Sequence, residues 1–300
     1  MFKRVFQLFK IARKLSISGA VESINQIYAL PLPISLFFNI FSIGSTITPI
    51  NDQKKPGEKI CVALQGMGTT FIKLGQFLAT RPDIIGEEMA KNLEKLQDKV
   101  PAFDVYEAKK IIKKELGEKQ FQNITELSAP IAAASIAQVH IAKIKNENQN
   151  KEVAIKILRP DIEILFNEEL DALMLFAYII ENTFSKAKRL KLVEVVYLLR
   201  EITNIEMDLR FEAAAANELF ENTKNDTGFN VPKIYWNYTT KKILTLDKVD
   251  GISIREHEKL QEYGVDLKSL AENLIQHFLK QAVRDGFFHG DMHQGNLFVD

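Results

Sequence analysis

The sequence has 300 residues, of which 46% are hydrophobic, enough to bury one large core or two modest ones. Its 39 lysines and arginines equal its 39 aspartates and glutamates in number, so no overall positive field favours nucleic acid as a partner. The single cysteine, Cys61, excludes an internal disulfide and fits a reducing compartment. No spacing of cysteine and histidine predicts a zinc site.

The first residues carry an uneven charge pattern. Apolar residues at roughly helical spacing alternate with five basic residues that precede the first acid, Glu22: Lys3, Arg4, Lys10, Arg13 and Lys14. A basic amphipathic helix of this kind can lie on an anionic membrane surface. The alternative is a helix that packs on the protein with a solvated basic edge, and the sequence favours neither.

The segment from Ser23 to Asn51 contains no charged residue. Pro31 and Pro33 interrupt it, and the apolar run that follows is too short and too polar to predict a membrane-spanning helix. It also lacks the cleavage site of a signal peptide. We therefore expect an interfacial or packed segment, and no transmembrane helix in the 300 residues.

The rest of the chain alternates between helical and strand-like patterns. Helices are predicted from about 59 to 96, 104 to 116, 161 to 184, 191 to 221 and 266 to 285, with Asp104 as an N-cap and Gly117 as a helix end. Two β-hairpins are predicted between them: 139–145 with 151–158, joined by the polar turn NENQN, and 231–238 with 241–249. This order predicts an α+β fold with an antiparallel sheet built from separated hairpins.

Lys156 ends the apolar run VAIK. A lysine at this place can bind the α- and β-phosphates of a nucleotide when a glutamate from a helix holds it. The segment EMDLRFE offers candidates, because Asp208 and Glu212 are four residues apart and are expected on one helix face. Alternatively, Lys156 is a strand-edge residue with a solvated amine, and the acidic helix is a solvated face with Arg210 as its counterion.

The segment HGDMHQGN places Asp291 five residues before Asn296. Phosphoryl transfer needs a carboxylate that accepts the proton of the acceptor hydroxyl and an amide oxygen for a magnesium ion, and this loop offers both. His289 is expected to brace the loop. A turn without function is the alternative, but Lys156, Glu212 and this loop follow one another in the order found in kinases.

Kinases cover the phosphates with a glycine-rich loop just before the lysine strand. This sequence has APIAAASIAQ there, from Ala129 to Gln138, and the backbone of alanine cannot approach a phosphate as closely as that of glycine. Ser135 offers a hydroxyl to a phosphate. The alternative is a helix start or a packing site for small residues.

Five segments together resemble the signature set of the UbiB-type atypical protein kinases, the AarF/UbiB-like family. They are KLGQ (73–76), AAASIAQVH (132–140), VAIK (153–156), EMDLRFE (206–212) and HGDMHQGN (289–296), in the order of the family. The resemblance implies an α+β, protein-kinase-like fold with an α-helical N-terminal extension. It also implies four regions: a basic and apolar N-terminal segment that is a candidate for the membrane interface (1–50), a helical extension with KLGQ (51–120), a kinase-like N-lobe with a helical insert (121–250) and the start of a C-lobe (251–300).

The resemblance further implies a role for each matched residue. Lys156 and Glu212 match the phosphate-anchoring ion pair, Asp291 matches the catalytic base, and Asn296 matches the magnesium ligand. Nucleotide binding is implied for the alanine-rich loop and the lysine: Ala132, Ala133, Ala134, Ser135 and Lys156. Regulation is implied for Lys73, Gln76, Glu206 and Asp208, with Lys73 pairing with the two acidic residues and blocking the groove for protein substrates.

The implied function is an ATP- and Mg²⁺-dependent kinase or ATPase that supports ubiquinone (coenzyme Q) biosynthesis. The expected partners are ubiquinone-biosynthesis enzymes, polyprenyl-phenol lipids and a membrane surface, with peripheral attachment to the cytoplasmic face of the inner membrane. Hydroxylase chemistry is not expected, because the sequence has no G-x-G-x-x-G flavin fingerprint.

Two other functions stay open. His-Gly-Asp at 289–291 is closer to the small-molecule phosphotransferases that modify choline or aminoglycosides, although KLGQ and the alanine-rich loop are not part of that pattern. A non-catalytic nucleotide-binding scaffold is the other alternative, because no Asp-Phe-Gly turn with a second metal-binding aspartate follows Asn296. We therefore expect a chain truncated after the catalytic loop, with an incomplete C-lobe, that is inactive by itself.

Overall fold

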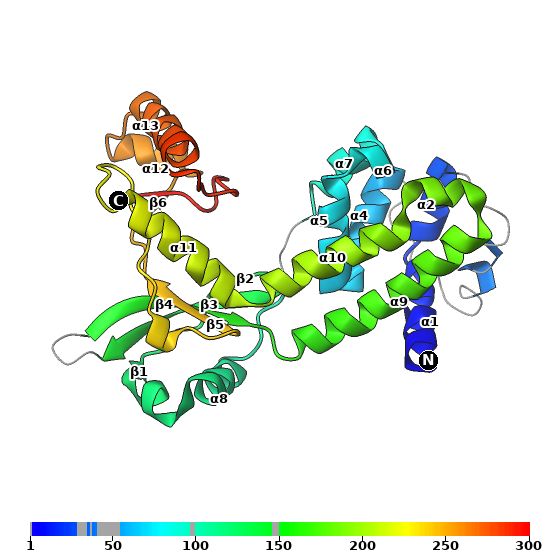
Figure 1. Ribbon diagram of the computed structural model, residues 1–300, viewed down its shortest axis with the longest axis horizontal. Coiled ribbons are helices and arrows are strands. Elements are labelled where there is room, and N and C mark those ends of the chain that lie inside the picture. Colours follow the sequence, from blue (N-terminus) through cyan, green and yellow to red (C-terminus); the bar gives the residue numbers. More distant parts are fainter. Residues whose placement is uncertain (1, 29–34, 37, 41–54, 97–99, 146–149) are drawn as a thin grey trace. The chain divides into compact units, whose positions relative to one another are not determined.

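The computed structural model describes residues 2–28, 35–36, 38–40, 55–96, 100–145 and 150–300 (Figure 1). Most of the charge-free segment and the NENQN turn lie outside these residues, so the interfacial or packed segment stays a prediction. Contacts divide the chain into two compact units. Unit 1 comprises Met1–Ala102, Ala133–Ile136 and Arg159–Ile205, and unit 2 comprises Phe103–Ala132, Ala137–Leu158 and Glu206–Asp300.

Unit 1 is built from helices. They are α1 (Phe2–Ile17), α2 (Ala20–Tyr28), α4 (Pro56–Met67), α5 (Thr69–Ala79), α6 (Pro82–Ile85), α7 (Glu87–Leu93), α9 (Ile162–Thr183), η1 (Ser185–Leu190) and α10 (Leu192–Glu206). The helices predicted at 59–96 and 161–184 are therefore present, the first as four shorter helices. Among the described residues, no helix is both long enough and apolar enough to cross a membrane.

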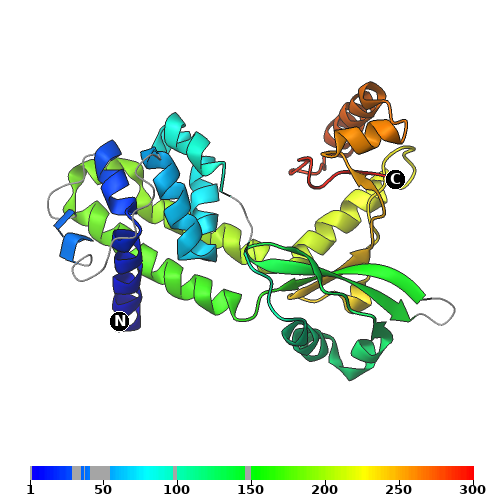
Figure 2. The same ribbon diagram turned by 180° about the vertical axis from the view of Figure 1, so that it is seen from behind.

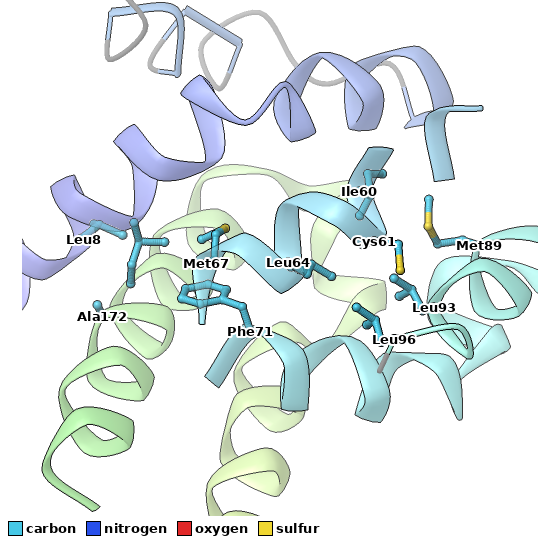
Figure 3. Packing of buried hydrophobic residues seen from close by; sticks show 11 residues of the cluster. Leu8, Ile60, Cys61, Leu64, Met67, Phe71, Met89, Leu93, Leu96 and Ala172 are labelled. Carbon is cyan, nitrogen blue, oxygen red and sulfur yellow. The ribbon is translucent and has the colours of Figure 1, made fainter. Parts of the chain in front are cut away.

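The core of unit 1 forms where α1, α4, α5, α7 and α9 meet (Figure 3). Apolar side chains that recur on one face of α4 pack against Phe71 of α5, which is almost fully buried. The spacing of the α4 residues is that of an amphipathic helix. They are Ile60, Cys61, Leu64 and Met67.

Helix α1 has the packed arrangement, one of the two that its sequence left open. Leu8 and Ile11 are buried in the core of unit 1, so the helix packs on the protein. Its other side exposes two aromatic rings, Phe6 at 60% and Phe9 at 43% of their surface, together with basic side chains. This exposed side is aromatic and basic rather than only basic.

Unit 2 contains an antiparallel sheet in the order β1-β3-β4-β5, with β2 paired to β3. The strands are β1 (Ile124–Thr125), β2 (Pro130–Ala133), β3 (Ala137–Lys145), β4 (Asn150–Leu158) and β5 (Ile243–Asp247). The first predicted hairpin is confirmed as β3 and β4. Helix α8 (Val105–Asn123) covers one face of this sheet, and α11 (Leu209–Thr223) lies on the other side (Figures 1 and 2).

The second predicted hairpin is present only in part. Its arms make one isolated antiparallel bridge, from Ile234 to Leu246, with hydrogen bonds from the Tyr235 N–H to the Thr245 carbonyl at 2.9 Å and from the Asp247 N–H to the Lys233 carbonyl at 3.0 Å. The first arm then turns through the short helix η2 (Trp236–Tyr238). The hydroxyl of Thr245 donates to the carbonyl of Tyr238 at 2.7 Å, so a side chain takes a place that a ladder bond would fill. Only β5 forms a strand, and its partner is β4.

The prediction of one helix from 191 to 221 is wrong, because two helices, α10 and α11, occupy this range. Asp208 separates them with an extended backbone (φ −120°, ψ 93°) and caps α11 by accepting the Arg210 N–H at 3.1 Å. Aspartate favours this N-cap position over a helix interior. The Leu209 N–H bonds to the carbonyl of Lys241 at 2.9 Å, which ties the start of α11 to the chain leading into β5.

The cap predicted at Asp104 is present, and the structure adds a second one at Asp266. Asp104 accepts the Tyr106 N–H at 2.6 Å, and Asp266 accepts the Lys268 and Ser269 N–H groups at the start of α13 (Leu267–Leu279). Gly117, with φ 80° and ψ 170°, breaks α8, but helical turns resume and continue to Asn123. The predicted helix end there is therefore a kink.

The C-terminal part of unit 2 follows α11 and β5. It contains β6 (Ile252–Ser253), α12 (His257–Glu262), α13, a π-helical turn η3 (Lys280–Asp285) and β7 (Phe298–Val299), which pairs with β6. The predicted helix 266–285 is thus α13 followed by η3. Arg284 in η3 binds Asp226, just after α11, at 2.8 and 2.9 Å, so the segment that leads to HGDMHQGN is anchored to the end of α11.

Candidate active site

Lys156 owes its position to the alternation of strand β4. Ile155 and Ile157 are fully buried in the core beneath α8, so Lys156, between them, points to the opposite face. Its backbone lies in the middle of the sheet, opposite Val139 of β3 and Leu244 of β5. Neighbouring strands on both sides therefore fix the base of this side chain.

Glu212 meets Lys156 from the first turn of α11. The ammonium Nζ lies 2.9 Å from Oε1 and 2.7 Å from Oε2, so it binds both carboxylate oxygens. The side chains are 27% and 50% exposed, and partly exposed ion pairs contribute only about 0–1 kcal/mol to stability. Stability therefore does not explain the pair, whereas a fixed ammonium on an open sheet face suits a phosphate ligand.

Asp208 and Glu212 do not form the like-charged pair on one helix face that the sequence predicts. Asp208 is the N-cap of α11, and its carboxylate binds the Arg210 guanidinium at 2.9 and 2.6 Å. This hydrogen-bonded guanidinium holds the pKa of Asp208 below its usual value. Each carboxylate has its own cation, so the expected repulsion is absent.

The alanine-rich loop is held by a residue that sequence reasoning missed. Arg159 follows β4 and donates to the carbonyl of Ala134 from Nε at 3.0 Å and from Nη2 at 2.8 Å. The same guanidinium also reaches the carbonyls of Val100 and Pro101 at 3.1 and 2.8 Å. An arginine directly after a predicted strand beside a loop of small residues is the only signal that the sequence gives.

The members of the alanine-rich loop differ in exposure. Ala132 is exposed, Ala133 and Ala134 are half-buried, and Ser135 is fully buried. The carbonyl of Ser135 accepts the Thr69 hydroxyl at 3.2 Å. For the Ser135 hydroxyl to reach a phosphate the loop would have to move, and its predicted role stays a prediction.

The KLGQ segment lies inside α5, and its glycine faces the core of unit 1. A Cβ on Gly75 would overlap Cδ1 of Leu96 and lie 3.0 Å from Cδ1 of Leu64. Lys73 and Gln76 lie outside this contact and are half-buried. Lys73 and Gln76 belong to unit 1. The two predicted partners of Lys73, which are Glu206 and Asp208, belong to unit 2, so the regulatory pairing stays a prediction.

The loop HGDMHQGN brings together Asp291 and Asn296 as predicted. Nδ2 of Asn296 donates to the carbonyl of Asp291 at 3.0 Å and to its carboxylate Oδ2 at 3.1 Å. His289 braces the turn by accepting the Asp291 N–H at 3.2 Å, and buried Gln281 of η3 accepts the His289 N–H at 3.3 Å. Oδ1 of Asp291 and Oδ1 of Asn296 have no hydrogen-bond partner among the described residues.

The free amide oxygen of Asn296 suits a hard cation. Carboxylate and amide oxygens are the ligands that Mg²⁺ takes from a protein, usually one or two of them, with phosphates and water completing the shell. Among the described residues, no group of three histidine, cysteine, aspartate or glutamate side chains could hold a metal ion. The amide oxygen Oδ1 of Asn296 is a ligand of the kind that a magnesium ion arriving with a nucleotide could take.

The Lys156–Glu212 ion pair and the HGDMHQGN loop are two separate clusters of unit 2. In the described part of the chain, no hydrogen bond or ion pair joins Lys156 or Glu212 to Asp291 or Asn296. They share a scaffold instead, because α11 carries Glu212 in its first turn and is anchored at its other end to η3. A ligand with several phosphates is the kind of molecule that can bridge two such clusters.

Comparison with known proteins gives a consistent result. The ABC1 atypical kinase-like domain family matches residues 95–300. The chain is 37% identical over 298 residues to the probable protein kinase UbiB of Marinobacter nauticus, covering 99% of this chain and 53% of that protein. It is 38% identical over 242 residues to the protein of the same name from Azotobacter vinelandii, covering 80% of this chain and 44% of that protein.

Among solved structures, the Rv3197–erythromycin complex from Mycobacterium tuberculosis is similar with a TM-score of 0.46 and 25% identity, covering 76% of this chain and 55% of that chain. The chain spans about half the length of the curated relatives it matches, 53% and 44% of the two named above. The α+β, kinase-like fold class is confirmed by the family match. The chain belongs to the ABC1 atypical kinase-like family, among the UbiB-type kinases.

Proposed function

We propose that this protein binds Mg²⁺–ATP and is a UbiB-type phosphotransferase or ATPase that supports ubiquinone biosynthesis. The observation that carries the proposal is the ion pair between Lys156 and Glu212, 2.7 Å apart although 56 positions separate them in the chain. A lysine on a strand that is held by a glutamate from a helix is how kinases anchor the α- and β-phosphates.

The remaining residues take roles that follow from their chemistry. Asp291 accepts the proton of the acceptor hydroxyl, or of water in an ATPase, at the oxygen Oδ1 that the loop leaves open. Asn296 holds the magnesium ion through Oδ1, while its Nδ2 group fixes Oδ2 of Asp291. When bound, the ion neutralises charge on the phosphates.

The alanine-rich loop and the regulatory residues complete the proposal. Ala132, Ala133, Ala134 and Ser135 cover the phosphates in place of a glycine-rich loop. Lys73 and Gln76 act with Glu206 and Asp208 to exclude protein substrates. We expect residues 1–300 alone to bind nucleotide without turnover, because the sequence contains no Asp-Phe-Gly turn to supply a second metal-binding aspartate.

The nucleotide site is tested by calorimetric titration of Mg²⁺–ATP and by ATP hydrolysis with the full-length protein. Glu212→Gln should weaken ATP binding, and Asp291→Asn should lower kcat by about 10²–10⁴-fold with nucleotide binding retained. Glu221→Gln is the matched control, since Glu221 lies on the same helix and pairs with Lys224 at 2.7 Å. Equal effects of the two glutamate substitutions, or undiminished turnover in Asp291→Asn, would refute the proposal.

We also propose that the protein binds peripherally to the cytoplasmic face of the inner membrane, through the exposed side of α1. Phe6 and Phe9 are exposed there beside Lys10 and Arg13, three and four residues apart, so rings and cations lie on one face. Aromatic side chains can enter the headgroup layer while basic side chains meet anionic lipids.

Co-sedimentation with vesicles tests this attachment. Lys10→Glu combined with Arg13→Glu should lower binding to phosphatidylglycerol vesicles about tenfold or more and leave phosphatidylcholine binding unchanged. Lys109→Glu with Lys114→Glu, on the exposed side of α8, is the control. Deleting α1 is a poor test, because Leu8 and Ile11 belong to the core. Equal binding by all three proteins would refute the attachment.

The proposed partners are ubiquinone-biosynthesis enzymes and polyprenyl phenols. ATP hydrolysis by the full-length protein should rise when a polyprenyl phenol is added in vesicles. Choline and an aminoglycoside serve as comparison substrates, because His-Gly-Asp is also typical of small-molecule phosphotransferases. Phosphorylation of either, with no response to the phenol, would replace the proposed function with that alternative.

A further inference from the structure

His293 lies two residues after Asp291, and one of its ring nitrogens is held by a hydrogen bond. Its Nδ1 accepts the Gly295 N–H at 2.9 Å, so the proton of the neutral ring is on Nε2. Nε2 lies 3.6 Å from Oδ2 of Asp291, which is longer than a hydrogen bond. Catalytic hydrogen bonds are often long before ligands bind and shorten in the reacting complex.

We propose that His293 is a positioning residue that holds Oδ2 of Asp291 through its Nε2–H and so presents Oδ1 to the acceptor. The inference rests on the proposed role of Asp291 as the base. Asn296 already donates to Oδ2 at 3.1 Å, and a second donor from His293 would fix the plane of the carboxylate. Both donors lie on one oxygen, which leaves the other oxygen free for the proton.

Gly295 is a second, independent observation. A Cβ at this position would lie 2.6 Å from Cε1 and 3.0 Å from Nδ1 of His293. Any other residue would push the ring out of its place, so the turn is shaped around the imidazole. The space next to the ring is also bounded by Nη2 of Arg255, 3.3 Å from the same Cβ position.

Two charged groups lie beside His293. Asp291 faces Nε2, and the Arg255 guanidinium lies near the side where Gly295 approaches. His289 is bonded to the backbone of Asp291 and not to its carboxylate. His293 is therefore the histidine of this loop whose ring faces the Asp291 carboxylate.

Two substitutions separate positioning from loop building. In His293→Asn, the amide oxygen can still accept the Gly295 N–H as an Asx turn, but no donor reaches Asp291. We expect kcat for ATP turnover to fall about tenfold to a hundredfold, with KM for ATP nearly unchanged. In His293→Gln, the longer side chain brings an N–H donor back toward Asp291, and part of kcat should return.

Gly295→Ala provides a cross-check through the steric contact. It should lower kcat as His293→Asn does, and the double variant should be no worse than either single one. Histidine-selective ¹⁵N NMR of the protein without nucleotide gives a readout besides activity. The signal that disappears in His293→Asn should show a protonated Nε2 and an unprotonated Nδ1.

Each outcome decides the inference. If His293→Asn keeps the wild-type kcat, the imidazole only builds the turn. If the NMR spectrum shows the proton on Nδ1, the ring has no donor for Asp291. Either result overturns the inference and leaves the role of Asp291 intact. Additive losses in the double variant with Gly295→Ala would also count against it. Absence of ATP turnover in the wild-type full-length protein overturns the proposed function and the inference together.

Discussion

Gly75→Ala tests why the KLGQ segment has a glycine. A methyl group at this position would overlap Cδ1 of Leu96 and lie 3.0 Å from Cδ1 of Leu64. Both leucines are buried in the core of unit 1, so neither can turn into solvent (Figure 3). The expected perturbation is therefore overpacking between α5, α4 and the segment after α7.

Two effects of opposite sign determine the magnitude. Alanine is more favourable than glycine inside a helix by about 0.8–1.0 kcal/mol. An extra methyl group in a packed core costs about 1–3 kcal/mol. Because two buried neighbours are affected, we expect the steric cost to win by about 1–2 kcal/mol. That corresponds to a lower melting temperature of unit 1 by about 2–8 °C.

Calorimetry and urea unfolding of the full-length protein measure this change. Gly66→Ala is the matched control, because Gly66 is also helical, in α4, and nothing lies within 4 Å of its Cβ position. This control should raise stability by a few tenths to about 1 kcal/mol, since only the helix-propensity effect remains.

A rescue experiment makes the reasoning refutable. The single change Leu96→Ala should lower the free energy of unfolding by about 2–5 kcal/mol. It also removes the side chain that the new methyl group would overlap. Adding Gly75→Ala to Leu96→Ala should therefore leave the free energy of unfolding unchanged or raise it. If Gly75→Ala stabilises the native protein as Gly66→Ala does, the close approach of Leu96 to α5 is wrong.

Three further predictions concern buried or capping polar groups. Burial lowers the pKa of His140 below 6.5, so the free energy of unfolding should fall as the pH drops below about 6.5, and His140→Gln should remove that slope in urea titrations. Burial raises the pKa of Glu169 above 4.5, so the folded protein disfavours the charged form of this carboxyl. Glu169→Gln should therefore raise the free energy of unfolding by an amount that grows as the pH rises from about 4.5 toward neutrality. A gain in the free energy of unfolding that does not grow with pH contradicts this prediction. Asp266→Ala should lower stability by about 0.5–2 kcal/mol through loss of the cap on α13, with Asp266→Asn nearly neutral by thermal unfolding.

The elements that the sequence predicts correctly have local causes. Alternating apolar residues predict strand β4. Because successive side chains of a strand point to opposite faces, Lys156 must face away from the core that buries Ile155 and Ile157. Asp104 is a helix cap because its carboxylate reaches an N–H group only two residues ahead. Such patterns require no knowledge of distant parts of the chain.

The errors arise where a distant contact decides. The break at Asp208 depends on the Lys241 carbonyl, which accepts the Leu209 N–H from a segment about thirty residues later. The second hairpin is incomplete where the Thr245 hydroxyl, and not a backbone N–H, donates to the Tyr238 carbonyl. His293 is not among the residues that the sequence predicts for the site. Its proposed role depends on the orientation and the tautomer of the ring, and the spacing of residues in a sequence gives neither.

Two motif residues show how the structure separates stability from chemistry. Gly75 is buried among apolar side chains, so changing it should alter the free energy of unfolding and leave the phosphate site untouched. Glu212 is half-exposed in an ion pair worth about 0–1 kcal/mol, so Glu212→Gln should hardly change stability. The same substitution should release the Lys156 ammonium from its fixed place and weaken ATP binding. Both residues belong to one sequence signature. The burial of Gly75 and the partial exposure of Glu212 are what distinguish a packing residue from the residue proposed to position a ligand.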